Sequence, residues 1–201
     1  MARQNSTRKK LQEVRIIGGK WKGRKVRFPM AAGLRPTPAR LRETIFNWLR
    51  PHIHDTACLD LFAGSGVLGF EALSQGAASL TVVDSHSACR DAIQAQATDF
   101  DDRLDVQSGD ALDYLRRCTT RFDIIFLDPP YDQPDLLMQS LSLVVERALC
   151  SNYIYAESRT LAHLHKVAQQ SGCAIVRETR AGDAHGALFK PPSHDSTGGR
   201  A

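Results

Sequence analysis

The chain has 201 residues, of which 42% are hydrophobic and 24% are charged, which suits one folded domain and excludes wholesale disorder. The net charge of +4 is unevenly spread, because residues 1–50 contain 14 Lys and Arg against two Asp and Glu, whereas residues 51–201 have a net charge of −8. This polarity predicts either a polyanionic partner bound beside an acidic catalytic domain or a solvated basic tail.

The N-terminal region is predicted to be a tail followed by a hairpin. Residues 1–12 are polar and basic without periodicity, so we expect them to be disordered. Residues 14–17 and 24–28 have the pattern of two short strands joined through glycines, with one cationic face. We assign the hairpin to residues 13–34. It is too small to be stable alone and must pack on the body or on a partner.

A helix is predicted to follow this hairpin. Thr37 is a good N-cap residue, and Pro38 suits the first helical position. We expect Arg40 and Arg42 to lie off the apolar stripe, with the arginine-rich stretch 35–42 facing a polyanion. The stripe itself has helical spacing and comprises Leu41, Ile45, Trp48 and Leu49.

From residue 57 the chain alternates short apolar strands with helical segments. The strands are predicted at 57–62, 80–84, 104–107, 122–128 and 153–157. The helices are predicted near 67–75, 86–98, 110–117, 134–148 and 160–170. This alternation is typical of an α/β fold with a mostly parallel, Rossmann-like sheet covered by helices on both faces. Two further strands, 174–180 and 187–190, are expected to form a hairpin at the sheet edge, followed by a disordered tail at 191–201.

A glycine-rich loop follows the first strand of this sheet. Gly64, Gly66 and Gly69 satisfy the G-x-G-x-x-G pattern between a strand and a helix, where glycines let the backbone approach a ligand closely. The pattern alone does not distinguish NAD, FAD and S-adenosylmethionine, and a tight turn without a ligand would also satisfy it. Ligands of such sheets bind beyond the carboxyl ends of the strands.

Two acidic residues follow the next two strands. Asp84 ends the second strand 20 residues after Gly64, where a carboxylate can accept hydrogen bonds from both ribose hydroxyls. Asp110 follows the third strand. It would either contact an adenosine moiety or cap the next helix, and the sequence leaves both roles open.

The motif that discriminates between chemistries is Asp128-Pro129-Pro130-Tyr131, directly after an apolar strand. Two prolines remove two N–H donors and make the turn rigid, so the Asp128 carboxylate and the Pro129 carbonyl form a surface of acceptors. Such a surface fits a substrate whose reacting group is an exocyclic amine. Tyr131 offers a face for stacking an extruded base, and we predict catalytic roles for these four residues.

These motifs resemble those of class I S-adenosylmethionine-dependent amino-methyltransferases. The stretches that begin at Arg15, Arg35, Arg42, Leu59 and Ala156 resemble, more narrowly, the RsmD family, which methylates the N2 amine of one guanine, called 966, in bacterial 16S rRNA. The resemblance spans about residues 14–157. It implies a seven-stranded class I methyltransferase sheet in a domain covering residues 35–190, with the N-terminal hairpin contacting rRNA.

The resemblance also implies which residues bind. Those expected to bind S-adenosylmethionine are Asp60, Phe62, Ala63, Gly64, Ser65, Gly66, Asp84, Ser85, Asp110, Ala111 and Asp128. Those expected to bind RNA are Arg15, Lys20, Lys22, Arg24, Lys25, Arg27, Arg35 and Arg40. The implied partner is 16S rRNA within an assembled or assembling 30S subunit.

Other functions are weighed against this one. Adenine-N6 methylation of DNA or RNA would use the same hydrogen-bond acceptors for an exocyclic amine. An NAD-dependent oxidoreductase would explain only the glycine loop and Asp84. A non-catalytic rRNA-binding assembly factor would explain only the basic N-terminal region. The five cysteines form no Cys-x-x-Cys pair, which favours a reducing compartment without a metal site or disulfides. No apolar run is long enough to span a membrane, so we expect a cytoplasmic protein. We also expect it to be a monomer.

Overall fold

The computed structural model describes residues 11–30, 36–100 and 103–193. A seven-stranded sheet forms the centre, with the strand order β5-β4-β3-β6-β7-β9-β8. The five strands from β5 to β7 are parallel, and β9 is antiparallel to both of its neighbours. The bounds are β3 Ala57–Asp60, β4 Ser79–Asp84, β5 Leu104–Ser108, β6 Phe122–Leu127, β7 Cys150–Ser158, β8 Ala174–Ala181 and β9 Ala184–Lys190.

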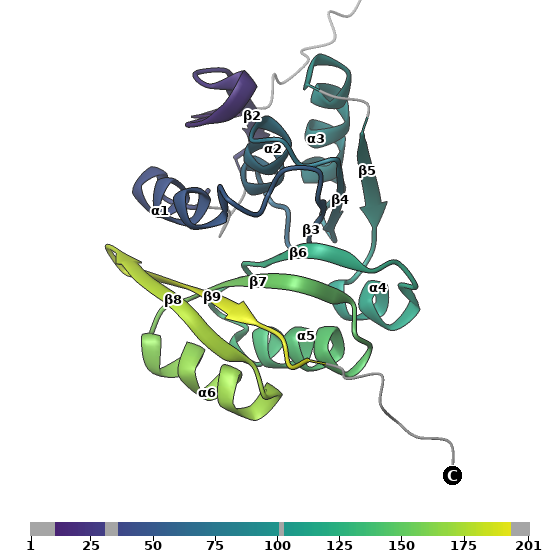
Figure 1. The fold of residues 1–201 in the computed structure, drawn as a ribbon. Coiled ribbons are helices and arrows are strands. Elements are labelled where there is room, and N and C mark those ends of the chain that lie inside the picture. The colour runs from purple at the N-terminus through teal and green to yellow at the C-terminus, as the bar shows by residue number, and fades with distance from the viewer. Residues whose placement is uncertain (1–10, 31–35, 101–102, 194–201) are drawn as a thin grey trace, which may run out of the picture.

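Helices cover both faces of the sheet (Figure 1). One apolar cluster joins the sheet to α1 (Ala39–Leu49), α2 (Val67–Ser74) and α3 (Ser87–Phe100). The other joins it to α4 (Ala111–Arg117), α5 (Pro134–Glu146) and α6 (Leu161–Ser171). Because successive strand residues point to opposite faces, strands buried on both sides read as continuous apolar runs, which explains why their positions follow from the sequence.

The predicted elements of the sheet domain are confirmed, with ends shifted by a few residues. The largest shifts are in β7, which begins at Cys150 and not at residue 153, and in β9, which begins at Ala184 and not at residue 187. The C-terminal hairpin forms the edge of the sheet as expected. Strand β9 inserts between β7 and β8.

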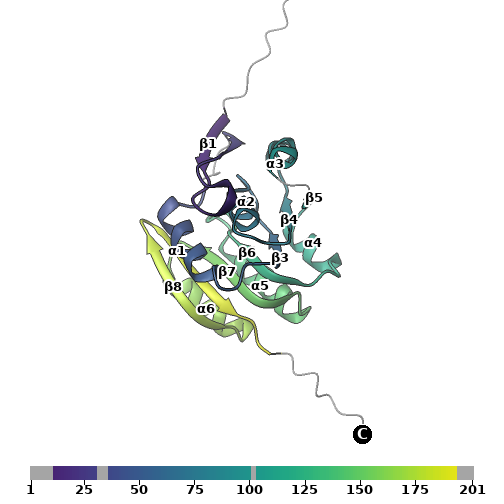
Figure 2. The ribbon, with the colours of Figure 1, turned by 45° about the horizontal axis from the view of Figure 1, so that its top comes forward.

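The N-terminal hairpin consists of β1 (Leu11–Arg15), a short 3-10 turn η1 (Gly19–Trp21) and β2 (Lys25–Pro29). It lies on the outer side of α2 and beside α3, away from the sheet (Figure 2). The prediction that residues 1–12 are disordered is wrong for the last two of them, because Leu11 and Gln12 belong to β1 and pair with β2. Three segments with sequence predictions lie outside the described residues. They are 1–10 of the predicted tail, 31–34 of the predicted hairpin, and 194–201 of the predicted C-terminal tail.

Two expectations for the first helix are wrong. The helix α1 begins at Ala39 with Pro38 at the N-cap, and the Thr37 side chain caps nothing; its hydroxyl lies 3.4 Å from Asp128 Oδ2. Arg42 does not face a polyanion, because it is 1% exposed and paired with Glu71 of α2. A buried partner supplied by another element overrides the amphipathic pattern of α1, since such pairing compensates the cost of burying a charge.

Candidate active site

Four carboxyl groups line the carboxyl-terminal edge of neighbouring strands in the order β4, β3, β6 and β7. They belong to Asp84, Asp60, Asp128 and Glu157. Residues two positions earlier, such as Val82, Cys58, Phe126 and Tyr155, all lie in the core cluster beneath α1 and α2. Side chains alternate along a strand, so the four carboxyl groups share this face of the sheet.

The glycine loop between β3 and α2 turns as its sequence requires. Gly66 has a φ of 75°, in the left-handed region, and a Cβ there would lie 3.0 Å from Ile93 Cγ1. Gly69 allows α2 to pack on the sheet, because a Cβ would lie 2.6 Å from Leu80 Cδ2. Both are roles that glycines have in nucleotide-binding loops of parallel sheets.

Asp84 connects this loop to the next strand. Its Oδ2 accepts a hydrogen bond from the Gly64 amide at 2.7 Å, and its Oδ1 accepts one from the His86 amide at 2.7 Å. Each carboxylate oxygen retains a lone pair, so Asp84 can still accept from a ribose hydroxyl. The exposed Ser85 lies beside it.

Asp110 is the N-cap of α4. Its Oδ1 accepts from the amides of Leu112 at 2.9 Å and Asp113 at 3.1 Å. Of the two roles left open by the sequence, capping is therefore confirmed, while contact with adenosine stays a prediction. Ala111 follows Asp110 as the first residue of the helix and is buried.

Asp60 lies beneath the glycine loop and is 1% exposed. No described atom is in hydrogen-bonding geometry with either carboxyl oxygen. Burial raises the pKa of this carboxyl to about 7, with further contributions from Asp128 and Asp84, and the backbone of Gly69 and Phe62 lowers it only in part. A buried acid without a donor fits a cationic ligand group above it, and S-adenosylmethionine carries an ammonium and a sulfonium.

Of the remaining loop residues expected at the cofactor, Ala63 and Ser65 are buried in the glycine loop, whereas Phe62 packs on the other face of the sheet. Ala63 is buried, and its amide bonds to the Val83 carbonyl at 3.0 Å. Ser65 is also buried, and its hydroxyl accepts from the Val67 amide at 3.3 Å. Phe62 is half-buried against the cluster on the other face of the sheet. The residues present therefore fit the cofactor that the resemblance implies.

Asp128 ends β6 and begins the rigid turn. It is half-buried, and desolvation raises the pKa of its carboxyl to about 7, while the hydroxyl of Thr37 lowers it. Pro129 is buried, Pro130 is exposed and Tyr131 is 36% exposed. The geometry therefore keeps the four predicted residues together, with an accessible aromatic ring next to an acceptor.

Two residues of the site were missed by sequence reasoning. The Thr37 hydroxyl contacts Asp128, although the two residues are 91 positions apart, and no local pattern could have indicated this contact. Glu157 is 2% exposed, and its Oε2 accepts from the Tyr131 hydroxyl at 3.4 Å. Its position at the end of the strand that follows the Asp128 strand is a signal that could have identified it.

The basic residues of the hairpin are exposed, but several have partners within the protein. Lys25 and Arg27 flank Glu13 at 2.5 and 3.2 Å and lower its pKa. Arg24 donates to the Asp99 carbonyl at 2.7 Å and lies over the Phe100 ring. Arg15 donates to the Gly23 carbonyl, and the Lys20 ammonium lies over the Trp21 ring. The side chains of Lys22 and Arg40 are exposed. Arg35 lies outside the described residues.

Two kinds of feature are absent from residues 11–30, 36–100 and 103–193. No group of three His, Cys, Asp or Glu side chains there could hold a metal ion. None of the helices in those ranges is long and apolar enough to cross a membrane.

The strand order with a single reversed strand, the glycine loop and the acceptor turn after β6 together define a class I S-adenosylmethionine-dependent methyltransferase. Comparison with known proteins agrees. A protein-family model described as "Conserved hypothetical protein 95" matches residues 14–190, so the chain belongs to this family, and the resemblance to RsmD is confirmed. The family favours a methyltransferase over the NAD-dependent alternative.

Individual relatives support the assignment. The chain is 39% identical over 181 residues to "Ribosomal RNA small subunit methyltransferase D" of Escherichia coli K12, covering 89% of this chain and 90% of the relative. The solved structure of yhhF from Escherichia coli is similar with a TM-score of 0.77 and 36% identity, covering 91% and 100%. The SMU.776 structure, complexed with SAH, shares the fold alone, with a TM-score of 0.64 and 19% identity over 82% of this chain and 53% of that one.

Proposed function

We propose that this protein transfers the methyl group of S-adenosylmethionine to the exocyclic N2 amine of guanine 966 in 16S rRNA. The observation that carries the proposal is the placement of Asp128, half-buried at the end of β6, between the cofactor loop and the Pro-Pro-Tyr turn. The name of the Escherichia coli relative, a small-subunit rRNA methyltransferase, supports RNA as the substrate.

The side chains account for activation of the amine. An exocyclic amine is a poor nucleophile because its lone pair is delocalised into the ring. Acceptance of its two hydrogens by Asp128 and the Pro129 carbonyl favours pyramidalisation and frees that lone pair. The cofactor supplies an electrophilic methyl group, and the protein supplies orientation and a largely dry pocket.

Asp128 also suits the proton transfer that completes the reaction. The methylated amine must lose a proton, and a carboxyl with a pKa of about 7 accepts one near neutral pH more readily than an ordinary aspartate. Tyr131 supports the extruded base by stacking. The hairpin and the exposed Arg40 contact phosphates, which positions the RNA, while the pocket at Asp128 selects the base.

We further propose that the substrate is the assembled or assembling 30S particle and that the protein acts as a cytoplasmic monomer. The direct test incubates the purified protein with radiolabelled S-adenosylmethionine and 30S particles from a strain that lacks this methylation. Mass mapping of the digested rRNA should locate one methyl group on N2 of a single guanine. A methyl group on adenine N6 would support the alternative enzyme, and absence of any transfer would favour a non-catalytic assembly factor.

A further inference from the structure

Glu157 and Asp128 are neighbours across two parallel strands. Ala156 of β7 pairs with Leu127 of β6, so Glu157 and Asp128 are the next residues in the same register. Adjacent strands lie about 4.8 Å apart, and both side chains point to the face beneath α1. The sheet therefore presents two carboxyl groups side by side at its substrate end.

Glu157 is held in place with one oxygen unused. Its Oε2 accepts from the Tyr131 hydroxyl, whereas Oε1 has no hydrogen-bond partner within the described part of the chain. Gly186, which pairs with Glu157 on the other side, has no side chain. The Tyr155 hydroxyl lies 2.6 Å from where a Cβ of Gly186 would be, and it is in hydrogen-bonding geometry with no described atom. A buried carboxyl oxygen without a donor is costly, so this atom indicates a ligand that brings an N–H or O–H group.

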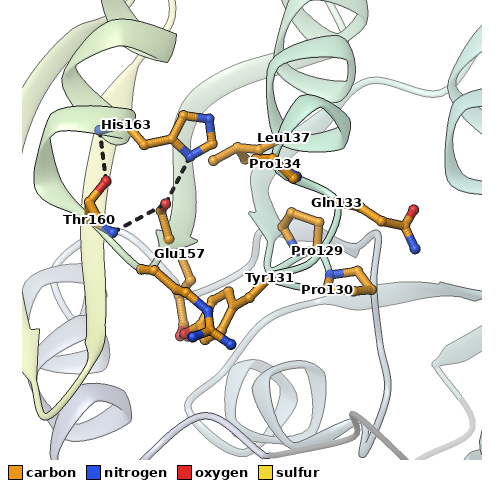
Figure 3. Close-up of a pocket in the computed structure, with 11 residues that line it drawn as sticks. Pro129, Pro130, Tyr131, Gln133, Pro134, Leu137, Glu157, Thr160 and His163 are labelled. Atoms are coloured by element: carbon orange, nitrogen blue, oxygen red, sulfur yellow. Dashed lines mark hydrogen bonds between the residues drawn. The ribbon is translucent and has the colours of Figure 1, made fainter.

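The space next to Glu157 suits a flat ring. A cavity of about 270 Å³ is lined by Pro129, Pro130, Tyr131, Glu157 and Arg159 (Figure 3). It extends toward Leu137 of α5 and His163 of α6, and Asp128 lies outside its lining. The guanidinium of Arg159 lies 5.2 Å from the centre of the Tyr131 ring. Proline and tyrosine surfaces with the Glu157 carboxyl at one side suit a flat heteroaromatic base, and the strand register places Asp128 next to this carboxyl.

We infer that Glu157 accepts a hydrogen bond from the ring N1–H of the target guanine while Asp128 holds the neighbouring N2 amine. This inference rests on the proposed function. In guanine, N1–H and the N2 amine are attached to the same carbon and form adjacent donors, which two adjacent acceptors match. A base that has the same amine but an unprotonated N1 would place a lone pair against Glu157.

The protonation state of Glu157 is compatible with this role. Burial raises its pKa well above the usual range, the charge of Asp128 adds to this, and the hydroxyls of Tyr155, Thr37 and Tyr131 oppose it. A hydrogen bond from N1–H adds to those of the hydroxyls and favours the ionised form of Glu157. The ionised carboxyl has acceptors only, so an unprotonated N1 finds no donor on Glu157.

The test compares 30S particles that carry either guanine or 2-aminopurine at the target position. 2-Aminopurine retains the 2-amine, but its N1 is an unprotonated acceptor. The wild-type protein should methylate it with a kcat/KM lower by about 10- to 100-fold, the range for losing a hydrogen bond to an acidic group. This measurement needs no variant, and equal rates on the two particles would overturn the inference.

Glu157→Gln provides the second measurement, because its amide can rotate to donate an N–H to an unprotonated N1. The preference for guanine over 2-aminopurine should narrow by about 10-fold relative to wild type. The missing O6 of 2-aminopurine affects both proteins alike and cancels in this comparison. The matched control is Glu146→Gln, an exposed residue at the end of α5, which should leave the preference unchanged.

The outcomes separate the two proposals. An unchanged preference in Glu157→Gln would overturn the role of Glu157 while leaving guanine methylation intact. Failure of the wild-type protein to methylate the guanine particle on N2 would overturn the proposed function and this inference with it.

Discussion

The Arg42 guanidinium lies 2.6 Å from the Glu71 carboxylate, and both side chains are at most 1% exposed. The same pair binds four further backbone groups. Arg42 donates to the carbonyls of Arg15 at 3.0 Å and Thr37 at 3.2 Å. Glu71 accepts from the amides of Ile17 at 2.7 Å and Gly18 at 3.3 Å. One buried ion pair therefore fastens the hairpin and the segment that carries Thr37 to α2.

Arg42→Met should destabilise the protein strongly, because it leaves the Glu71 carboxyl buried without its partner. We expect the free energy of unfolding to fall by about 3–5 kcal/mol, measured by urea denaturation. Arg40→Met, an exposed residue of the same helix, is the control and should change it by about 0.5 kcal/mol or less. Equal effects of the two substitutions would contradict a central role for the pair.

Asp128→Ala should abolish methyl transfer to the particle, because it removes the acceptor of the amine hydrogens. Affinity for S-adenosylmethionine, measured by calorimetry, should stay within a few-fold of wild type. In contrast, Asp84→Ala should weaken cofactor binding, since it removes the carboxylate that accepts a hydrogen bond from the Gly64 amide and that we expect to accept from the ribose hydroxyls. Normal turnover by Asp128→Ala would exclude its catalytic role.

The rate of methyl transfer should depend on pH through Asp128. The reaction needs its ionised form, so a carboxyl with a pKa of about 7 gives a rate that rises between about pH 6 and pH 8. The Thr37 hydroxyl favours the ionised form, and Thr37→Val should therefore move this limb upward by roughly half a unit to one unit. The control Thr44→Val, on α1, should leave the profile in place; identical profiles for all three proteins would refute the assignment.

Asp60→Asn should change how stability depends on pH. The pKa of Asp60 is raised to about 7 in the folded protein, so the folded state holds an extra proton between about pH 4 and pH 7. Its contribution to stability is therefore complete at low pH and is lost as the pH rises through this window. The free energy of unfolding of Asp60→Asn, measured by urea denaturation, should rise relative to that of wild type by on the order of 1–3 kcal/mol between pH 4 and pH 8. A constant difference across this range would disprove the shift.

Lys22→Gln combined with Arg40→Gln should weaken binding to the 30S particle at low salt and reduce its salt dependence. Two lost phosphate contacts lower the slope of log K against log salt by about 1.4 to 1.8. Substitution of exposed side chains is the appropriate test, because deletion of the whole hairpin would also remove the partners of Arg42 and Glu71. A slope equal to that of wild type would mean that neither side chain contacts phosphate.

Much of the fold and part of the site follow from local pattern. The parallel strands, the glycine loop and the Asp128–Tyr131 turn were predicted because each depends on residues next to one another in sequence. The role of Asp110 as a helix cap was one of two predicted roles and is confirmed by its backbone partners, while its contact with adenosine stays a prediction. Thr37 and Arg42 were misassigned, because their partners Asp128 and Glu71 lie far along the chain.

The sequence by itself determined the fold class, the glycine loop and the Asp-Pro-Pro-Tyr turn, since strand periodicity, glycine spacing and the conformational limits of proline act over a few residues. Only the tertiary structure decided which charges are buried and which carboxyl groups act together. Asp60, Asp128 and Glu157 become neighbours through the strand order, which brings β3, β6 and β7 side by side. Desolvation depends on that placement and raises the pKa of all three carboxyl groups, and the charge of Asp128 raises the pKa values of Asp60 and Glu157 further.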